Sequence, residues 1–307
     1  MRKVLVWSIG IVMVTMIVVT IGSSFYMLDY SLSPNPDRKD TAACFRELFE
    51  KYPETHTWVD SLRRVDALRD TFIIMPNGER HHALYVRNGG NRTALVLHGW
   101  RKCSIDILFL ARVYERVLGY SVVMPDFHAH GLSDGDMIQM GWLDRKDMME
   151  WIETFKTDTM VVHGVSMGGA TTMMMSAMDY PEEVKDIRFV DDCGYTSVWD
   201  EFSGELNNQF GLPEMPLMYT TSILCKLCYG WSFGEASAID EVKRSDYPMY
   251  FIHGGSDTFV PTEMAQRLYE SKRSNKELWI AEGAEHAESY LKHKDEYIKR
   301  LKAFVSK

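Results

Sequence analysis

A serine between two glycines is the first feature of this sequence that could do chemistry. Ser166 stands at the centre of Gly164-Val165-Ser166-Met167-Gly168, after a short apolar run and before small residues that suit a helix. In a sharp turn from a strand into a helix, glycines on either side of the serine leave space where larger side chains would collide. The spacing therefore predicts a serine hydroxyl held on a tight turn, where it can act as a nucleophile.

A serine hydroxyl is a weak nucleophile unless a base removes its proton, so a histidine and an orienting acid should follow. Asp257 follows the apolar run of "MYFIHGGSD", and His286 follows that of "LWIAEGAEH". Serine, aspartate and histidine in this chain order, each after its own strand, are typical of serine hydrolases built on a parallel sheet. We expect Asp257 to orient His286, and His286 to take the proton of Ser166.

A second position competes for the role of the acid. Asp191 and Asp192 end another apolar run, "FVDD", which is also expected to be a strand. We prefer Asp257 and keep Asp192 as the alternative acid. Each residue taken alone has a simpler explanation, because Asp257 could cap a helix and His286 could lie at the surface.

Acyl transfer also needs hydrogen-bond donors for the negative charge that develops on the carbonyl oxygen. We expect one from the backbone N–H of Met167, directly after the nucleophile. The other is expected from Trp100 in "LVLHGWRK", with the N–H of Arg101 as the alternative. His98 is expected to order this loop through hydrogen bonds rather than to react.

Short apolar runs that alternate with helical patterns must position these residues. They predict a mostly parallel sheet with helices on both faces, preceded by a hairpin around Asn77-Gly78. We expect an α/β domain over residues 70–307, interrupted at about residues 195–246 by a helical cap over the strand ends. Residues 29–69 are expected to form a linker and a packing helix.

The N-terminal segment has a different character. Arg2 and Lys3 precede Val4–Ile21, an unbroken apolar segment that as a helix would be roughly 27 Å long and could cross a bilayer. We expect residues 1–28 to be an uncleaved transmembrane anchor, with a cleaved signal peptide as the alternative. The basic residues place the N-terminus in the cytoplasm and the rest outside. A chain starting near Asp37 would keep every proposed catalytic residue.

Composition and charge limit the remaining classes of function. The chain has 307 residues, of which 46% are hydrophobic and 25% charged, as in ordinary globular proteins. Its formal net charge is −9 and no run of basic residues is present, so we expect no nucleic-acid partner.

Six segments together resemble the α/β-hydrolase superfamily: "HGW", "PDFHAHGLSDG", "MGWLDRKDMMEWI", "GVSMGG", "IHGGSDTFVP" and "GAEHAESY". More narrowly, they resemble bacterial membrane-anchored hydrolases related to serine peptidases of the prolyl-oligopeptidase type and to bile-acid acyltransferase-like hydrolases. The resemblance covers about residues 70–305. It implies cofactor-independent hydrolysis at an acyl carbon by Ser166, Asp257 and His286. The loop "DFHAHGLSDG" has His128 where the commoner form has arginine, which changes its ion pairing.

Two further groups of residues could suggest a metal. Asp126, His128 and His130 are close in sequence, but the resemblance makes their segment a structural loop. Cys225 and Cys228 have C-x-x-C spacing, yet a second such pair is missing, which argues against zinc. We expect neither a metal nor a cofactor.

The expected activity is cleavage of carboxylic esters, or of thioesters and small amides, through an acyl-enzyme on Ser166. A serine peptidase of the same fold and a catalytically idle, membrane-tethered binding protein are the alternatives. The intact serine, histidine and elbow glycines favour an enzyme, and the short cap favours an esterase. The expected partners are a small acyl substrate and, through the N-terminal helix, the membrane.

Overall fold

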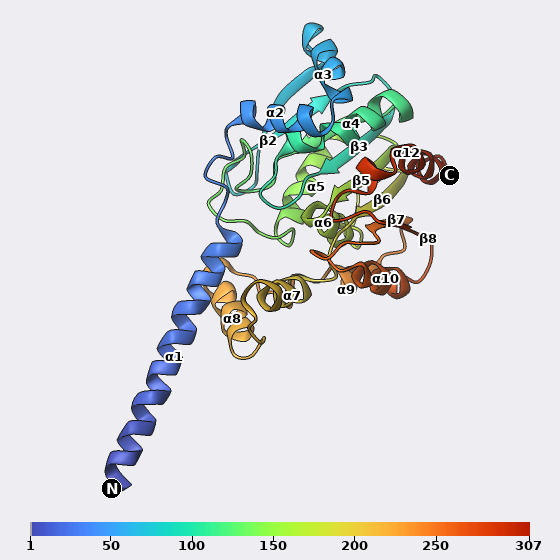
Figure 1. The fold of residues 1–307 in the computed structure, drawn as a ribbon. Coiled ribbons are helices and arrows are strands. Elements are labelled where there is room, and N and C mark those ends of the chain that lie inside the picture. Colours follow the sequence, from blue (N-terminus) through green and yellow to red (C-terminus); the bar gives the residue numbers. More distant parts are fainter. Residues whose placement is uncertain (1) are drawn as a thin grey trace.

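An eight-stranded sheet organises residues 2–307, the part of the chain that the computed structural model describes (Figure 1). The strand order is β1-β2-β4-β3-β5-β6-β7-β8, and among these strands only β2 runs against its neighbours. The predicted mostly parallel α/β fold is therefore confirmed, as is the hairpin formed by the first two strands. The strands are β1 (Leu68–Ile74), β2 (Arg80–Val86), β3 (Arg92–Leu97), β4 (Ser121–Pro125), β5 (Thr159–Val165), β6 (Asp186–Asp192), β7 (Met249–Gly254) and β8 (Lys276–Ala281).

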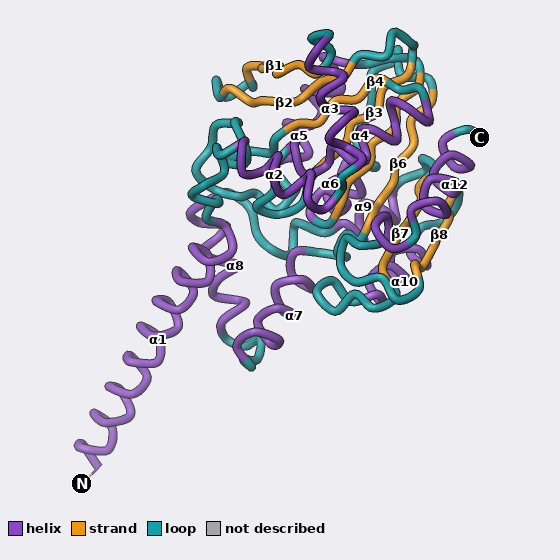
Figure 2. The backbone as a smooth tube through the Cα atoms, turned by 45° about the horizontal axis from the view of Figure 1, so that its top comes forward, coloured by secondary structure: helices purple, strands orange, loops and turns teal. Residues whose placement is uncertain are grey.

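Helices cover both faces of the sheet (Figure 2). Alternate residues of a strand point to opposite faces, so β3 contributes to two cores. Leu95 and Leu97 pack in the core under α5, α6, α9 and α10, while Ala94 and Val96 pack in the core under α3, α4 and α12. The helices outside the N-terminal segment and the cap are α2 (Thr41–Lys51), α3 (Glu54–Arg64), η1 (Ser104–Ile107), α4 (Leu108–Val113), η2 (Tyr114–Leu118), α5 (Asp144–Phe155), α6 (Met167–Met175), α9 (Ala238–Arg244), α10 (Thr262–Ser271), α11 (Ser289–Lys292) and α12 (Lys294–Val305).

Two helices follow β6 in the sequence and precede β7: α7 (Val198–Phe210) and α8 (Leu217–Tyr229). They project from one end of the molecule (Figure 1). The side chain of Ser197 caps α7 by accepting from the backbone N–H of Asp200, and Gly211 ends it with a φ of 64°. Left-handed backbone at this position is easiest for glycine. These helices occupy the segment in which we expect the cap.

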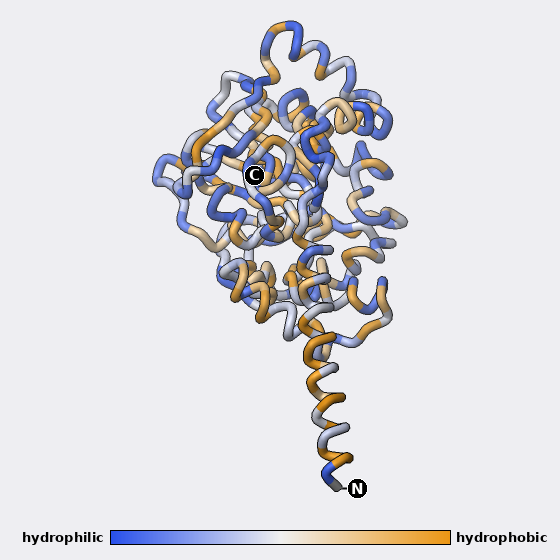
Figure 3. The backbone as a smooth tube through the Cα atoms, turned by 90° about the vertical axis from the view of Figure 1, so that its left-hand side faces the viewer, coloured by the Kyte–Doolittle hydropathy of each residue, from blue (hydrophilic) through white to orange (hydrophobic). Residues whose placement is uncertain are grey.

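One long helix, α1 (Arg2–Leu32), extends away from the rest of the molecule (Figures 1 and 3). Its segment Lys3–Leu32 has a mean hydropathy of 2.6 in the most apolar window, none of which is buried. Leu28 and Leu32, however, are each only 1% exposed and belong to a core. The helix continues past the predicted boundary at residue 28 because its first breaker is Pro34, which disfavours helical backbone in the residue before it.

The C-terminal helix differs from its expected form. The pattern of residues 288–307 predicts one helix, whereas the structure has α11 and α12 separated at His293, whose φ and ψ are −131° and 44°. The imidazole Nε2 of His293 lies 2.8 Å from the carbonyl oxygen of Glu282. This contact with the loop after β8 accompanies the break, and a helical periodicity does not reveal it.

Candidate active site

A strained turn between β5 and α6 holds the predicted nucleophile. Ser166 has φ 58° and ψ −119°, a conformation that non-glycine residues rarely adopt. A Cβ added to Gly164 would lie 1.9 Å from the carbonyl oxygen of Gly168, and one added to Gly168 would lie 2.3 Å from that of Leu97. Side chains at both glycines are therefore excluded by backbone, which is the physical reason for the glycine spacing.

Three predicted residues meet at the carboxyl ends of three strands. The Nε2 atom of His286 lies 2.9 Å from Oγ of Ser166, and its Nδ1 atom lies 2.8 Å from Oδ2 of Asp257. Ser166 follows β5, Asp257 follows β7, and His286 follows β8. This arrangement allows the hydroxyl to donate to Nε2 while the N–H at Nδ1 donates to the carboxylate.

Backbone and a second histidine fix the carboxylate of Asp257. Its Oδ1 atom accepts from the backbone N–H groups of Phe259 and Val260, both at 3.0 Å. His253, which donates to the carbonyl of Val260, lies 3.3 Å from Oδ2. Burial alone would raise the pKa of Asp257, but the hydrogen bonds of His253 and His286 hold that pKa at about 2. The group is therefore ionised at neutral pH. Sequence reasoning missed His253, whose only sign is its place in "IHGGSD".

The alternative acid, Asp192, lies in a different buried network. Its Oδ2 atom accepts from the hydroxyl of Tyr297 at 2.7 Å, and that hydroxyl lies 3.1 Å from Nε2 of His163. The hydroxyl of Tyr114 is 3.0 Å from the other ring nitrogen of His163. Burial raises the pKa of Asp192 to about 6 and lowers the pKa of His163 to about 3. Among the hydrogen bonds of residues 2–307, none joins Asp192 to His286.

The neighbouring Asp191 is a buried carboxyl with one partner. Its Oδ1 atom accepts from the backbone N–H of Gly194 at 2.9 Å, while Oδ2 has no partner within residues 2–307. Burial raises the pKa of Asp191 to about 7. The folded protein therefore holds a proton between about pH 4 and pH 7 that the unfolded chain has released.

Stability should consequently fall as the pH rises through this window, and Asp191→Asn should remove part of that fall. The variant carries a neutral side chain of the same shape, so its free energy of unfolding should fall less steeply than that of the parent. The difference in slope is expected to be about 1 kcal/mol per pH unit between pH 5 and 7. Urea unfolding of the detergent-solubilised chain at several pH values measures it, with the exposed Asp179→Asn as control. Parallel slopes for parent and Asp191→Asn would contradict the assignment.

The loop after β3 brings the candidate oxyanion donors to the nucleophile. A Cβ on Gly99 would lie 3.5 Å from that of Ser166, so the loop runs directly beside it. The N–H of Arg101 donates to Nε2 of His130 at 3.1 Å and is therefore occupied. Within residues 2–307, no hydrogen bond engages the N–H of Trp100 or that of Met167. Trp100 is therefore favoured over Arg101.

Two neutral histidines hold this loop. Nδ1 of His98 is 2.8 Å from the carbonyl of Gly99, and its Nε2 accepts from the N–H of Phe127. Nδ1 of His130 is 2.9 Å from the carbonyl of His128, which leaves Nε2 to accept from the N–H of Arg101 in the loop after β3. Burial lowers the pKa of both His98 and His130, that of His130 to about 3. Their structural role matches the expectation for His98.

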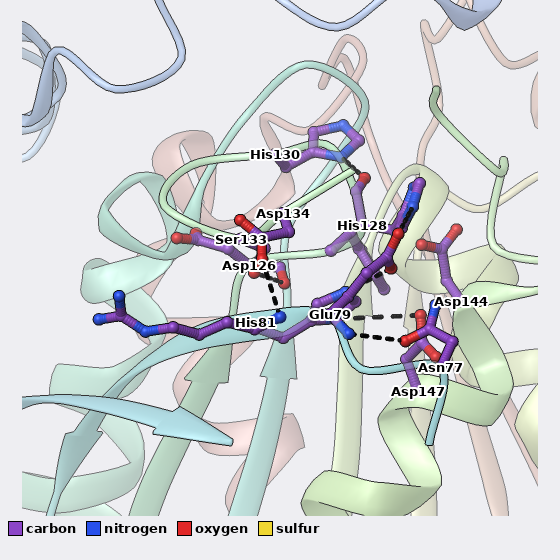
Figure 4. A network of polar contacts seen from close by, with 12 residues as sticks. Asn77, Glu79, His81, Asp126, His128, His130, Ser133, Asp134, Asp144 and Asp147 are labelled. Carbon is purple, nitrogen blue, oxygen red and sulfur yellow. Dashed lines mark hydrogen bonds and ion pairs between the residues drawn. The ribbon is translucent and has the colours of Figure 1, made fainter. Parts of the chain in front are cut away.

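A polar network below His130 anchors the loop that follows β4 (Figure 4). Asp126 accepts from Nδ1 of His82 at 2.7 Å and from the backbone N–H groups of Ser104 and Leu132. His128 points elsewhere: its Nδ1 lies 2.8 Å from a carbonyl, and its Nε2 lies 3.3 Å from a carboxylate oxygen of Glu79. His128 thus lies beside the carboxylate of Glu79.

Ser166 lines two cavities. The first has a mostly apolar lining from α1, α7 and α8 and encloses about 870 Å³, its open mouth included. The second, of about 910 Å³, reaches α2 and is lined in part by charged side chains, including Lys51 and Lys102. Trp100 and Phe259 line both.

Comparison with known proteins gives relatives in sequence and in structure. No protein-family model matches the chain. The uncharacterized protein YqkD of Bacillus subtilis is 31% identical over 218 residues, which cover 69% of this chain and 70% of that protein. A carboxylesterase of Bacillus subtilis is 21% identical over 223 residues, 67% of this chain and 89% of the relative.

Solved structures share the fold. The esterase Pf2001 of Pyrococcus furiosus superposes with a TM-score of 0.63 at 21% identity, over 80% of this chain and 94% of its own. An esterase from Exiguobacterium antarcticum gives a TM-score of 0.56 at 17% identity, over 78% of this chain and 100% of its own. With the sequence relatives, the strand order and the turn at Ser166, these similarities establish that the chain belongs to the α/β-hydrolase superfamily.

Proposed function

We propose that this protein is a serine hydrolase that cleaves carboxylic esters through an acyl-enzyme on Ser166. One observation carries the proposal: His286 lies within hydrogen-bond distance of both Ser166 and Asp257, at 2.9 and 2.8 Å, on a turn where Ser166 has a strained backbone. Similarity to proteins named as a carboxylesterase and as esterases also supports ester cleavage.

The mechanism follows from the positions of these groups. Oγ of Ser166 attacks the ester carbonyl while Nε2 of His286 takes its proton, and Asp257 stabilises the imidazolium that forms. The N–H groups of Trp100 and Met167 receive the developing oxyanion. His286 then returns the proton to the departing alcohol, which leaves an acyl-enzyme. Water, deprotonated by the same histidine, attacks the acyl carbon and releases the acid and free Ser166.

A fluorophosphonate probe combined with a substrate panel tests the proposal. The probe should label Ser166, and p-nitrophenyl esters should be cleaved faster than aminoacyl nitroanilides. Faster cleavage of the anilides would favour a peptidase. The absence of both labelling and hydrolysis would favour the idle binding protein.

We further propose that α1 anchors the protein in the cell membrane with the hydrolase domain outside. Support comes from the length and hydropathy of Lys3–Leu32 and from the basic residues before Val4–Ile21. Protease added to intact spheroplasts should digest a tag at the C-terminus, and the full chain should resist carbonate extraction. Protection of the tag until lysis would reverse the orientation, and release of the chain by carbonate would favour a secreted form.

A further inference from the structure

The apolar cavity beside Ser166 is partly built from the helix that carries the proposed membrane span. Met27, Tyr30 and Ser31 of α1 line it, together with Phe202 and Leu206 of α7 and Met218 of α8. Pockets with mostly apolar linings and a few polar groups are typical binding sites for apolar ligands. Since α1 forms one wall, the cavity is a joint product of the N-terminal segment and the hydrolase domain.

Hydrogen bonds fix this wall to the site. The indole N–H of Trp100 donates to the carbonyl of Ser31 at 3.0 Å, and the guanidinium of Arg101 donates to that of Tyr30 at 3.0 Å. The hydroxyl of Tyr30 donates to the side chain of Gln209 in α7 at 2.7 Å. The last turn of α1 therefore forms hydrogen bonds both with the loop after β3, which contains Trp100 and Arg101, and with α7.

With Val4–Ile21 in the bilayer as proposed, the cavity would lie close to the level of the bilayer surface. Met27 is six residues beyond Ile21, the end of the apolar span, which is roughly 9 Å along a helix. The polar headgroup region on each side of a bilayer is roughly 5–8 Å thick, so Met27 would lie at its outer boundary. A cavity at this height can receive the chain of a lipid that has not fully left the membrane.

An exposed apolar stripe on α8 supports this placement. Tyr219, Ile223 and Leu227 are four residues apart, so they lie along one side of the helix, and they are 48%, 61% and 76% exposed. Figures 1 and 2 both show α8 beside α1. An apolar stripe next to a membrane-spanning helix, with tyrosine at its edge, is typical of segments that dip into the bilayer interface.

The second cavity has more charged side chains in its lining. Glu47 and Lys51 of α2 line it, together with Lys102 and Asp106, whose charged groups lie 3.3 Å apart. Ser166 thus lines both an apolar cavity and one that also contains charged side chains. An ester whose acyl chain is long and whose alcohol is polar would fill both with its carbonyl at the nucleophile.

We propose that the substrates are acyl esters of membrane lipids, whose acyl chain enters the cavity between α1, α7 and α8 directly from the bilayer that holds α1. This inference rests on the proposed ester hydrolysis and assigns its substrate class. Met27 is the α1 side chain best suited to test it, because a larger residue there would shorten the cavity from the membrane side.

The experiment uses the full chain in vesicles of an ether-linked phosphatidylcholine, which contains no acyl ester, with two fluorogenic esters: 4-methylumbelliferyl oleate in the bilayer and the water-soluble butyrate. Met27→Trp should lower the ratio of kcat/KM for oleate to that for butyrate about tenfold or more, since lost chain contacts weaken transition-state binding. Phe25→Trp, two residues away and outside the cavity lining, should keep the parental ratio. Leu206→Trp fills the cavity from α7 and should repeat the effect of Met27→Trp.

Fluorophosphonate labelling of Ser166 reports whether each variant is folded. If butyrate is cleaved and Ser166 is labelled while oleate is not cleaved, or if both tryptophan variants within the cavity keep the parental ratio, the lipid proposal is wrong and ester hydrolysis stands. If neither ester is cleaved and the parent is not labelled, the proposed function itself fails.

Discussion

Ser166→Ala is expected to lower ester hydrolysis roughly a thousandfold or more while the protein stays folded. Without Oγ no acyl-enzyme can form, and His286 has no hydroxyl from which to take a proton. Alanine keeps the Cβ of Ser166, so the turn between Gly164 and Gly168 meets no new atom. The measurements are kcat/KM for p-nitrophenyl butyrate and the thermal unfolding midpoint.

Ser176→Ala is the matched control for this variant. Ser176 is buried near the end of α6, and its hydroxyl donates to the carbonyl of Met173, away from the triad residues. It should keep the parental activity. If Ser166→Ala hydrolysed the ester nearly as fast as the parent, another group would have to be the nucleophile.

Asp257→Asn is expected to lower kcat by about a hundredfold to ten-thousandfold. The N–H groups of Phe259 and Val260 both donate to Oδ1, so the amide oxygen of asparagine must stay there. Its NH₂ group then faces Nδ1 of His286, which must become an acceptor and leave the proton on Nε2. In that tautomer Nε2 cannot accept the proton of Ser166.

Asp192→Asn distinguishes the two candidate acids. Asparagine can still accept from the hydroxyl of Tyr297 through its amide oxygen, so the buried network persists. We expect a loss of kcat smaller than about tenfold, because this carboxyl does not contact His286. Steady-state kinetics of the two variants side by side provide the measurement. A larger loss for Asp192→Asn than for Asp257→Asn would show that Asp192, and not Asp257, orients His286.

The elements of the site that sequence could predict are those with local causes. A Cβ on Gly164 would meet Gly168 in the same turn, so this part of the turn leaves a local pattern in the sequence, whereas Gly168 is required by the backbone of Leu97 in β3. An apolar run followed by a polar loop indicates the end of a strand, and this pattern predicts Asp257 and His286 at strand ends. The mostly parallel sheet follows from the same alternation.

The elements that sequence could not predict depend on contacts between distant segments. Tyr114 and Tyr297 contact opposite nitrogens of His163 from different helices, and no periodicity links them. Hydropathy likewise marks the span up to Ile21 but not the burial of Leu28 and Leu32. These positions are determined by tertiary packing.

This packing bears on a chain starting near Asp37. Such a chain does keep the proposed catalytic residues, but it lacks two leucines of the core, Leu28 and Leu32. It also lacks Met27 and Tyr30, which form one wall of the apolar cavity. A truncation that preserves the site would have to cut within the apolar span, before residue 22.

Because α1 is one unbroken helix from Arg2 to Leu32, the proposed anchor would hold Ser166 at a nearly constant height above the plane of the membrane. For a lipid ester, encounter with the enzyme becomes lateral diffusion in two dimensions. The rate would then follow the mole fraction of the ester among its neighbouring lipids and not its concentration in the bulk volume. Dilution of the whole suspension with buffer would leave turnover unchanged, whereas dilution with inert lipid would slow it.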